Sequence, residues 1–185
     1  KSLLTELLSR STGLSVQEAA DGMLALPNHV YVLPPGSHVT ILKGMLRLSP
    51  LGASITKQNA VDTFLTSLAV ERGDKAIGII LSGTGRDGTQ GAQVIKQAGG
   101  IIFAEEPTAA GHPGMPESVI QTGVVDYVLR PREIGSVLHA ISRDLASVDA
   151  PTAQIKILEK HESVFKRILK HVKDANGVDF THYKR

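Results

Sequence analysis

The stretch IILSGTGRDGT at residues 79–89 places one acid, Asp87, in a glycine-rich turn directly after an apolar run. Residues 83–88 match G-x-G-x-x-G, the pattern of a dinucleotide-binding loop that follows a strand and opens a helix. Such glycines let a pyrophosphate approach the backbone, and the helix N-terminus attracts its negative charge. Glu105 and Glu106 follow about 20 residues later, where a dinucleotide site has its ribose-binding acid. Nucleotide binding is therefore one interpretation of this turn.

Two other roles compete for Asp87. A carboxylate beside a pyrophosphate repels it, although Arg86 could offset that repulsion. Asp87 and the glycines could instead make a tight turn and cap a helix. Alternatively, an Asp that follows a buried strand can orient a catalytic histidine, while neighbouring backbone N–H groups face a developing oxyanion. From these residues alone, the nucleotide loop, the helix cap and the triad acid all remain open.

The elements around this turn follow an alternating pattern. AIGIIL is continuously apolar, TQGAQVIKQAGG is typical of a helix with a glycine stop, and GIIFA is apolar again. This order predicts a βαβ unit in a parallel sheet that helices cover, with a right-handed crossover. We then expect a proline- and glycine-rich loop, a short helix from about Glu117, a strand at 124–129 and a helix at 131–145.

The upstream part predicts a helix and short strands. Leu3, Leu4, Leu7 and Leu8 repeat at helical spacing until Gly13. HVYVLPPG and HVTILKGMLRLS predict partly antiparallel strands, with Lys43 and Gly44 as a hairpin turn. A loop around residues 49–60 should lead to a helix with its apolar face made of Val61, Phe64, Leu65, Leu68 and Ala69.

Composition narrows the classes of function. The 185 residues are 42% hydrophobic and carry a net charge of +2, which indicates neither a nucleic-acid partner nor membrane insertion. The chain contains no cysteine, so disulfides and thiolate metal sites are excluded. None of the seven histidines has a recognisable metal-ligand spacing. We therefore expect a cytoplasmic protein without a metal site.

The stretch from AIGIIL to VVDYVL, residues 76–129, resembles the C-terminal half of the CheB-type protein-glutamate methylesterases. The matching pieces are the strand before SGTGRDG, the helix ending in KQAGG, the loop ending in GMP, and TGVVDYVL. Upstream, EAADGMLALPNHVYVLPPGSHVTI is similar to the middle of the same domain. The resemblance covers residues 1–146 and implies an α/β fold. We expect a mostly parallel sheet with helices on both faces, a small antiparallel hairpin portion and a C-terminal helical extension.

The resemblance also implies a chemistry. That family hydrolyses glutamyl methyl esters on bacterial chemoreceptors with a Ser, His, Asp triad and without a cofactor. By this match Asp87 is the triad acid, and the backbone N–H of Thr84 helps to form the oxyanion hole. Met115, in GMP, would lie on a loop near the active-site face or serve in packing. A noncatalytic module that binds a nucleotide or docks on a receptor is the alternative.

The family's nucleophile and base motifs, G-A-S-x-G-G and Q-H, do not occur in this chain. We therefore expect an N-terminally incomplete domain that is inactive as given. Ser54 and Ser82 are weak alternatives for the nucleophile, because Ser54 lies in a loop and Ser82 is more typical of a structural hydroxyl. His38 and His112 lie nearest the predicted site loops and are weak alternatives for the base.

Residues 147–154 indicate a linker, and residues 155–185 the start of a helical region. Within that region, residues 158–173 predict a basic amphipathic helix whose charged face is more typical of solvent exposure than of phosphate binding. The end of the chain, VFKRILKHVKDANGVDFTHYKR, resembles the opening of a CheR-type chemoreceptor methyltransferase. Both resemblances together imply a piece of a methylesterase–methyltransferase fusion. Its partners would be a methylated chemoreceptor and the fused methyltransferase domain.

Overall fold

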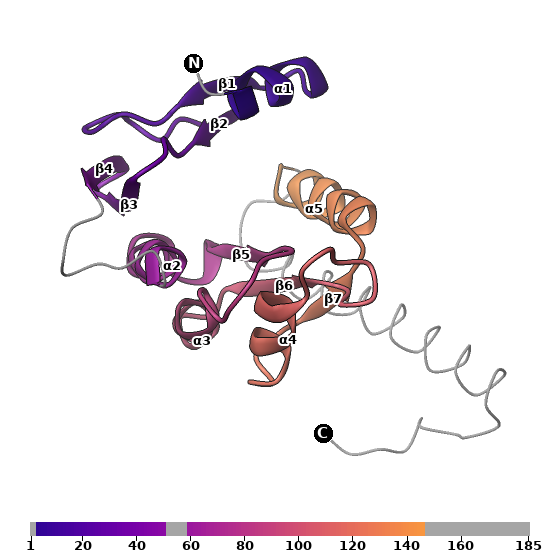
Figure 1. Ribbon diagram of the computed structural model, residues 1–185. Coiled ribbons are helices and arrows are strands. Elements are labelled where there is room, and N and C mark those ends of the chain that lie inside the picture. The colour runs from indigo at the N-terminus through magenta and orange to yellow at the C-terminus, as the bar shows by residue number, and fades with distance from the viewer. Residues whose placement is uncertain (1–2, 51–58, 147–185) are drawn as a thin grey trace, which may run out of the picture. The chain divides into compact units, whose positions relative to one another are not determined.

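The computed structural model describes residues 3–50 and 59–146 (Figure 1). The chain divides after Pro131 into two compact units, and helix α5 (Pro131–Ala146) lies almost wholly in the second. The predicted helix at 131–145 is thereby confirmed. The predicted loop around Ser54, the linker and the basic C-terminal helix fall outside the described residues.

The first elements are helix α1 (Leu3–Ser11) and the parallel strands β1 (Ser15–Glu18) and β2 (His29–Val32). The helix confirms the prediction from the leucine spacing. Strand β1 was not predicted, because the sequence SVQE contains a single apolar residue, Val16. Hydrogen bonding to β2 makes it a strand, which no local pattern indicates.

Strands β3 (Ser37–Leu42) and β4 (Met45–Pro50) form the predicted antiparallel hairpin. The turn residues Lys43 and Gly44 both have positive φ, 50° and 73°. Positive φ at both central residues is what a type I′ turn requires, and its twist matches that of the strands. The prediction of a turn at these two residues is confirmed.

Two side chains of helix α2 (Ala60–Arg72) accept hydrogen bonds from this hairpin. The Glu71 carboxylate accepts the turn's N–H groups, from Lys43 at 2.8 Å and from Gly44 at 2.7 Å. One turn earlier in the helix, Ser67 Oγ accepts the N–H of Ile41 at 3.1 Å. The C-terminal half of α2 is therefore anchored on the hairpin.

The βαβ prediction is confirmed. Strand β5 (Ile77–Ile80), helix α3 (Thr89–Gln97) and strand β6 (Ile101–Glu105) follow in order, and β5 and β6 pair in parallel. Strand β7 (Tyr127–Leu129) adds on the other side of β6, so the sheet order is β5–β6–β7 (Figure 1). With the hairpin, this sheet confirms the α/β fold class.

The core of this region is apolar and fully enclosed. Helices α2 and α3 pack on each other, and α3 and helix α4 (Gly114–Ile120) pack on the sheet. The buried residues of the cluster are Leu65, Ala69, Ala76, Ile80, Ala92, Ile95, Ile102, Ala104 and Val119. Burial of the Leu, Ile and Val side chains in this cluster stabilises the folded chain by roughly 1.5–3 kcal/mol each.

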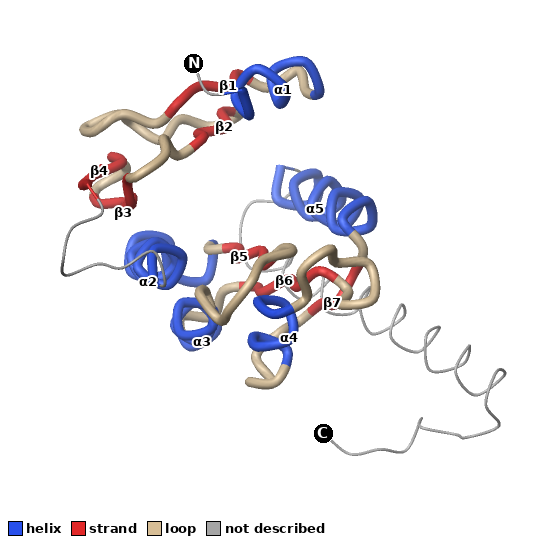
Figure 2. The backbone as a smooth tube through the Cα atoms, viewed as in Figure 1, coloured by secondary structure: helices blue, strands red, loops and turns tan. Residues whose placement is uncertain are grey.

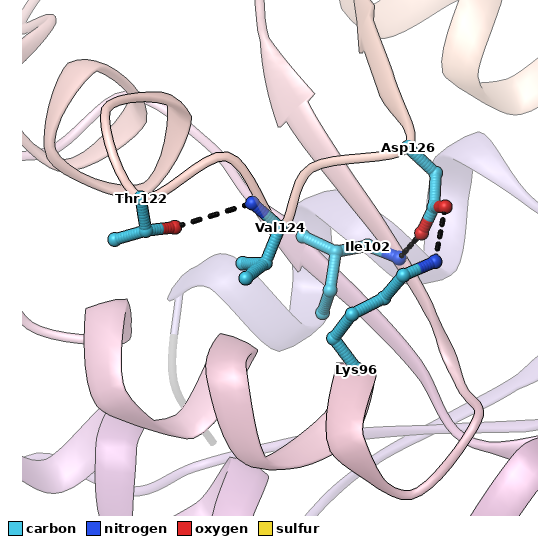
Figure 3. A network of polar contacts seen from close by, with 5 residues as sticks. All are labelled: Lys96, Ile102, Thr122, Val124 and Asp126. Atoms are coloured by element: carbon cyan, nitrogen blue, oxygen red, sulfur yellow. Dashed lines mark hydrogen bonds and ion pairs between the residues drawn. The ribbon is translucent and has the colours of Figure 1, made fainter. Parts of the chain in front are cut away.

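Two boundaries differ from the prediction. Helix α4 begins at Gly114, three residues before Glu117, because Pro116 occupies its first turn, where a missing N–H costs no hydrogen bond. Strand β7 begins at Tyr127 rather than at 124. There the side chain of Asp126 accepts the N–H of Ile102 at 2.9 Å and pairs with Lys96 of α3 (Figure 3). The Asp126 carboxylate thus accepts the Ile102 N–H in place of a backbone carbonyl of a neighbouring strand.

Candidate functional site

The glycine-rich turn lies at the carboxyl end of β5 and leads into α3. Gly85 and Gly88 have φ of 86° and 92°, so both adopt a backbone that favours glycine. Gly88 is buried, and a Cβ there would meet Ile80 Cδ1 at 2.8 Å and Val61 Cγ1 at 3.0 Å. Backbone conformation and packing therefore require glycine at these positions whether or not a ligand binds.

Within the described residues, the N–H groups of Thr84, Gly85 and Arg86 donate to no acceptor. All three residues are exposed. Unpaired N–H groups close to the N-terminus of α3 carry partial positive charge, which can stabilise a negative oxygen. The Thr84 N–H is therefore available as a donor within the described residues.

Asp87 caps a helix, although not the one that it precedes. Its Oδ2 accepts the N–H of Val61 at 3.0 Å, and its Oδ1 accepts the N–H of Asp62 at 2.9 Å. Both donors belong to the first turn of α2, where N–H groups have no partner within the helix. Helix α3 itself begins after Gly88 without a side-chain cap. The capping interpretation is confirmed, and the capped helix is α2.

This cap fixes the orientation of the carboxylate without using all of its capacity. An ionised carboxylate offers about four lone-pair sites, of which the two N–H groups take two. A third donor, such as an imidazole N–H, can therefore bind the same group. Capping and the role of a triad acid are compatible in one residue.

The loop after β6 is hydrogen-bonded to the loop after β5 (both loops are tan in Figure 2). The Ser82 N–H donates to Glu105 Oε2 at 2.7 Å, and Ser82 Oγ accepts the N–H of His112 at 2.9 Å. The Gly83 N–H donates to the carbonyl of His112 at 2.8 Å, while its own carbonyl accepts the N–H of Met115 at 2.9 Å. Ser82 is therefore a structural hydroxyl, as expected.

Two glycines permit this close approach of the loops. A Cβ at Gly83 would lie 2.3 Å from the sulfur of Met115, and a Cβ at Gly114 would lie 3.1 Å from the Gly85 nitrogen. Met115 packs against Gly83 and also against the apolar core. The packing role expected for this methionine is therefore confirmed, whereas its expected place on a loop is wrong, because Met115 lies in the first turn of α4.

The acids that a nucleotide site would need are engaged elsewhere. Glu105 is buried, with 6% of its surface exposed, and binds the Ser82 N–H beneath the turn. Glu106 pairs with Arg130 at 2.9 Å. Hydrogen bonds from Arg130 and Thr108 lower the pKa of the Glu106 carboxyl below its ordinary value. Because Glu105 is buried and Glu106 already has two partners, the nucleotide interpretation is weakened.

The weaker candidates do not assemble around Asp87. His38 is buried in β3, and within the described residues its Nδ1 has no hydrogen-bond partner. His112 is exposed and joins the turn through its backbone. The ring of neither histidine hydrogen-bonds to Asp87, whose described partners are the two N–H groups of α2. Ser54 lies outside the described residues.

Within residues 3–50 and 59–146, no group of three or more His, Asp or Glu side chains is placed to hold a metal ion. No helix in those ranges is long and apolar enough to cross a membrane.

What remains is a carboxylate held by a helix N-terminus, next to backbone N–H groups that have no acceptor among the described residues. A carboxylate of this kind can orient an imidazole, and the N–H groups can bind the oxyanion of a tetrahedral intermediate. The arrangement suits acyl transfer at an ester or amide, provided that a nucleophile and a base join it.

Sequence comparisons point the same way. A family model described as CheB methylesterase matches residues 1–138. A protein-glutamate methylesterase/protein-glutamine glutaminase of Myxococcus xanthus is 37% identical over 140 residues, which are 74% of this chain and 41% of that protein. An uncharacterized 104.1 kDa protein of Rhodobacter capsulatus is 36% identical over 132 residues, and the match covers 71% of this chain and 14% of that protein.

A solved structure is also similar. The catalytic domain of the Thermotoga maritima CheB methylesterase superposes with a TM-score of 0.65 at 33% sequence identity. The match covers 73% of this chain and 74% of that domain. The chain thus spans most of one catalytic domain but less than half the length of the curated relatives cited above.

Proposed function

Because the chain belongs to the CheB methylesterase family, we propose that it is part of an enzyme that hydrolyses glutamyl methyl esters on methylated chemoreceptors. Asp87 is the acid of the triad, and the Thr84 N–H is one donor of the oxyanion hole. A segment upstream of these residues supplies the serine and the histidine, since their motifs do not occur in the chain.

The reaction follows the general scheme of serine hydrolysis. The serine Oγ attacks the ester carbonyl while the histidine takes its proton, and the oxyanion that forms is bound by backbone N–H groups such as that of Thr84. Methanol leaves with the proton from the histidine. Water, deprotonated by the same histidine, then hydrolyses the acyl-enzyme to a glutamate. Asp87 holds the imidazole in one tautomer and stabilises its protonated form.

One observation carries this proposal: both oxygens of Asp87 are held by N–H groups of α2, close in the chain to the Thr84 N–H, which has no acceptor in the described part of the structure. A surface carboxylate in a flexible turn could not orient a base in this way. Here two hydrogen bonds fix the plane of the carboxylate, and the remaining lone pairs are open to an imidazole.

The first test measures methanol release from a methylated receptor fragment. The 185-residue chain is compared with a version extended upstream through the expected serine and histidine motifs. We expect activity in the extended protein alone. Equal activity in both would place the nucleophile within the present residues and reopen Ser54 and Ser82. Silence in both would favour a noncatalytic docking module.

The second test replaces Asp87→Asn in the extended protein. We expect the esterase rate to fall by up to ~10⁴-fold, because the histidine loses its acceptor and its tautomer. The new amide also turns an N–H toward one donor of α2, which costs roughly 1–3 kcal/mol of stability. The assay therefore runs well below the unfolding temperature of the variant. A folded variant with full activity would refute the triad role.

We further propose that residues 155–185 begin a CheR-type methyltransferase module fused to the esterase. The phrase GVDFTHYK supports this proposal, and the 104.1 kDa relative is far longer than one such domain. The test is binding of a methyl-donor cofactor to a version of the protein extended downstream, measured by calorimetry. Failure of a well-folded extended protein to bind that cofactor would count against the fusion.

A further inference from the structure

Asp62, in the first turn of α2, makes two hydrogen bonds that bracket the start of α3. Its backbone N–H donates to Asp87 Oδ1 at 2.9 Å, and its side-chain Oδ1 accepts the N–H of Gly91 at 2.7 Å. Asp87 and Gly91 are four residues apart on the same turn-to-helix segment. The two bonds therefore close a ring between α2 and that segment, which resembles a capping box shared by two helices.

Helices α2 and α3 cross at this ring, and they are too close there to admit a side chain at Gly91. A Cβ at Gly91 would lie 2.5 Å from Leu65 Cβ and 3.0 Å from the carbonyl oxygen of Asp62. Gly91 is buried, and so is Leu65. Because the backbones touch here, Asp62 cannot shift along α3 without losing its bond to Gly91. This contact therefore fixes the position of the first-turn N–H groups of α2 relative to Asp87.

We propose that Asp62 is a positioning residue for Asp87. It holds the first turn of α2 at the place where the N–H groups of Val61 and Asp62 fix the plane of the Asp87 carboxylate. The inference rests on the proposed triad role of Asp87. Asp62 itself touches no reacting atom, since its carboxylate faces the backbone of α3.

A simpler role for Asp62 would be that of an acid in the first helical turn, where it interacts favourably with the helix dipole. The two roles separate by substitution. Asp62→Asn removes the charge and keeps an Oδ1 that can accept the Gly91 N–H. Asp62→Ala removes both. A positioning role needs the acceptor, whereas a dipole role needs the charge.

Glu71 provides a matched control at the other end of the same helix. Its carboxylate also accepts two backbone N–H groups, but these belong to the hairpin turn. Glu71→Ala should destabilise the protein through α2 as well, yet it leaves the ring around Asp87 intact. A loss of rate that merely follows stability would appear in both variants.

The kinetic test uses the upstream-extended protein with a methylated receptor fragment. We expect Asp62→Ala to lower kcat by about 10²-fold with KM unchanged, because a misplaced catalytic group costs a factor of this order. Asp62→Asn should restore most of the rate, and Glu71→Ala should leave kcat unchanged. An unchanged kcat in Asp62→Ala, an equal loss in Asp62→Asn, or an equal loss in Glu71→Ala would each overturn the proposal.

A second readout does not depend on catalysis. In the 185-residue chain, hydrogen exchange of the Val61 and Asp62 amides should accelerate in Asp62→Ala and stay slow in Asp62→Asn and Glu71→Ala. Unchanged protection in Asp62→Ala would refute the positioning role even if Asp87→Asn is inactive. Conversely, accelerated exchange together with a fully active Asp87→Asn would refute the triad proposal and show that Asp62 only organises the turn.

Discussion

Helix α1 and the elements around the parallel sheet both form where their sequence patterns predict them, yet their apolar side chains differ in burial. Leu3, Leu4 and Leu7 of α1 are 72%, 52% and 52% exposed. By contrast, Ile95, Ile102 and Val119 around the parallel sheet have no exposed surface. A correct local pattern thus predicts the elements in both regions, but among the described residues only the second region supplies partners that bury their apolar side chains.

This difference matters for the candidate site. The turn with Asp87 is held by α2, β6, α4 and the loop after β6, all within residues 59–120. Nothing in residues 3–35 hydrogen-bonds to it in the described structure. Its geometry should therefore respond to substitutions in the enclosed core and be insensitive to substitutions on α1.

The largest effect is expected from Ile102→Ala in β6. Removing this fully buried side chain leaves a cavity among Gly78, Ile95 and their neighbours, and should cost about 2–5 kcal/mol of unfolding free energy. Urea unfolding of the 185-residue chain measures it. A loss of unfolding free energy smaller than that of an α1 substitution would contradict the difference in burial between the two regions.

Gly91→Ala should come next. The added methyl group has no space between α2 and α3, and overpacking of this kind costs typically about 1–3 kcal/mol. Gly13→Ala is the control, because a Cβ at Gly13 meets nothing within 4 Å. Thermal unfolding of both variants measures the contrast. Equal shifts in the two would show that the close packing of α2 on α3 does not control the response.

Leu4→Ala and Leu7→Ala on α1 should change the unfolding free energy by no more than about 0.5 kcal/mol. Both side chains are already half exposed, and alanine is the best helix former, so little is lost. The same urea titration measures these variants. A loss of several kcal/mol would mean that α1 carries a buried face after all, and the comparison would fail.

The smallest effect concerns Tyr127, whose ring stacks on Phe103. Burial raises the pKa of its hydroxyl above the ordinary value of 10.0, and the charge of Asp126 adds to the shift. Because the folded state holds this proton more tightly, its contribution to stability is complete below about pH 10 and is lost as the pH rises through the raised folded pKa. Tyr127→Phe should lose less stability than the parent between neutral and strongly alkaline pH. Parallel curves of Tm against pH would contradict this.

Several elements could be predicted because their causes are local. Lys43 and Gly44 were recognisable as a turn between two apolar runs, and the βαβ unit followed from alternating apolar segments and glycine stops. Strand β1 could not be predicted, since only pairing with β2 defines it. The start of α4 was misjudged because two prolines suggested a loop, whereas the first turn of a helix tolerates them.

The candidate site divides in the same way. A glycine-rich turn with one acid at the end of a buried strand was visible in residues 79–89, and its likeness to the methylesterases singled out Asp87 and Thr84. The cap on α2 was not visible, because its donors lie 25 and 26 residues away. Nor was the role of Glu105, which a motif search reads as a ligand-binding acid and which is in fact buried beneath Ser82.

By itself the sequence determined the hairpin turn, the βαβ unit and which acid stands in the critical turn, since periodicity and glycine act over a few residues. Only the tertiary structure decided what that acid binds. A carboxylate in a turn accepts whichever N–H groups packing brings within reach, and here the crossing of α2 and α3 at Gly91 brings those of Val61 and Asp62.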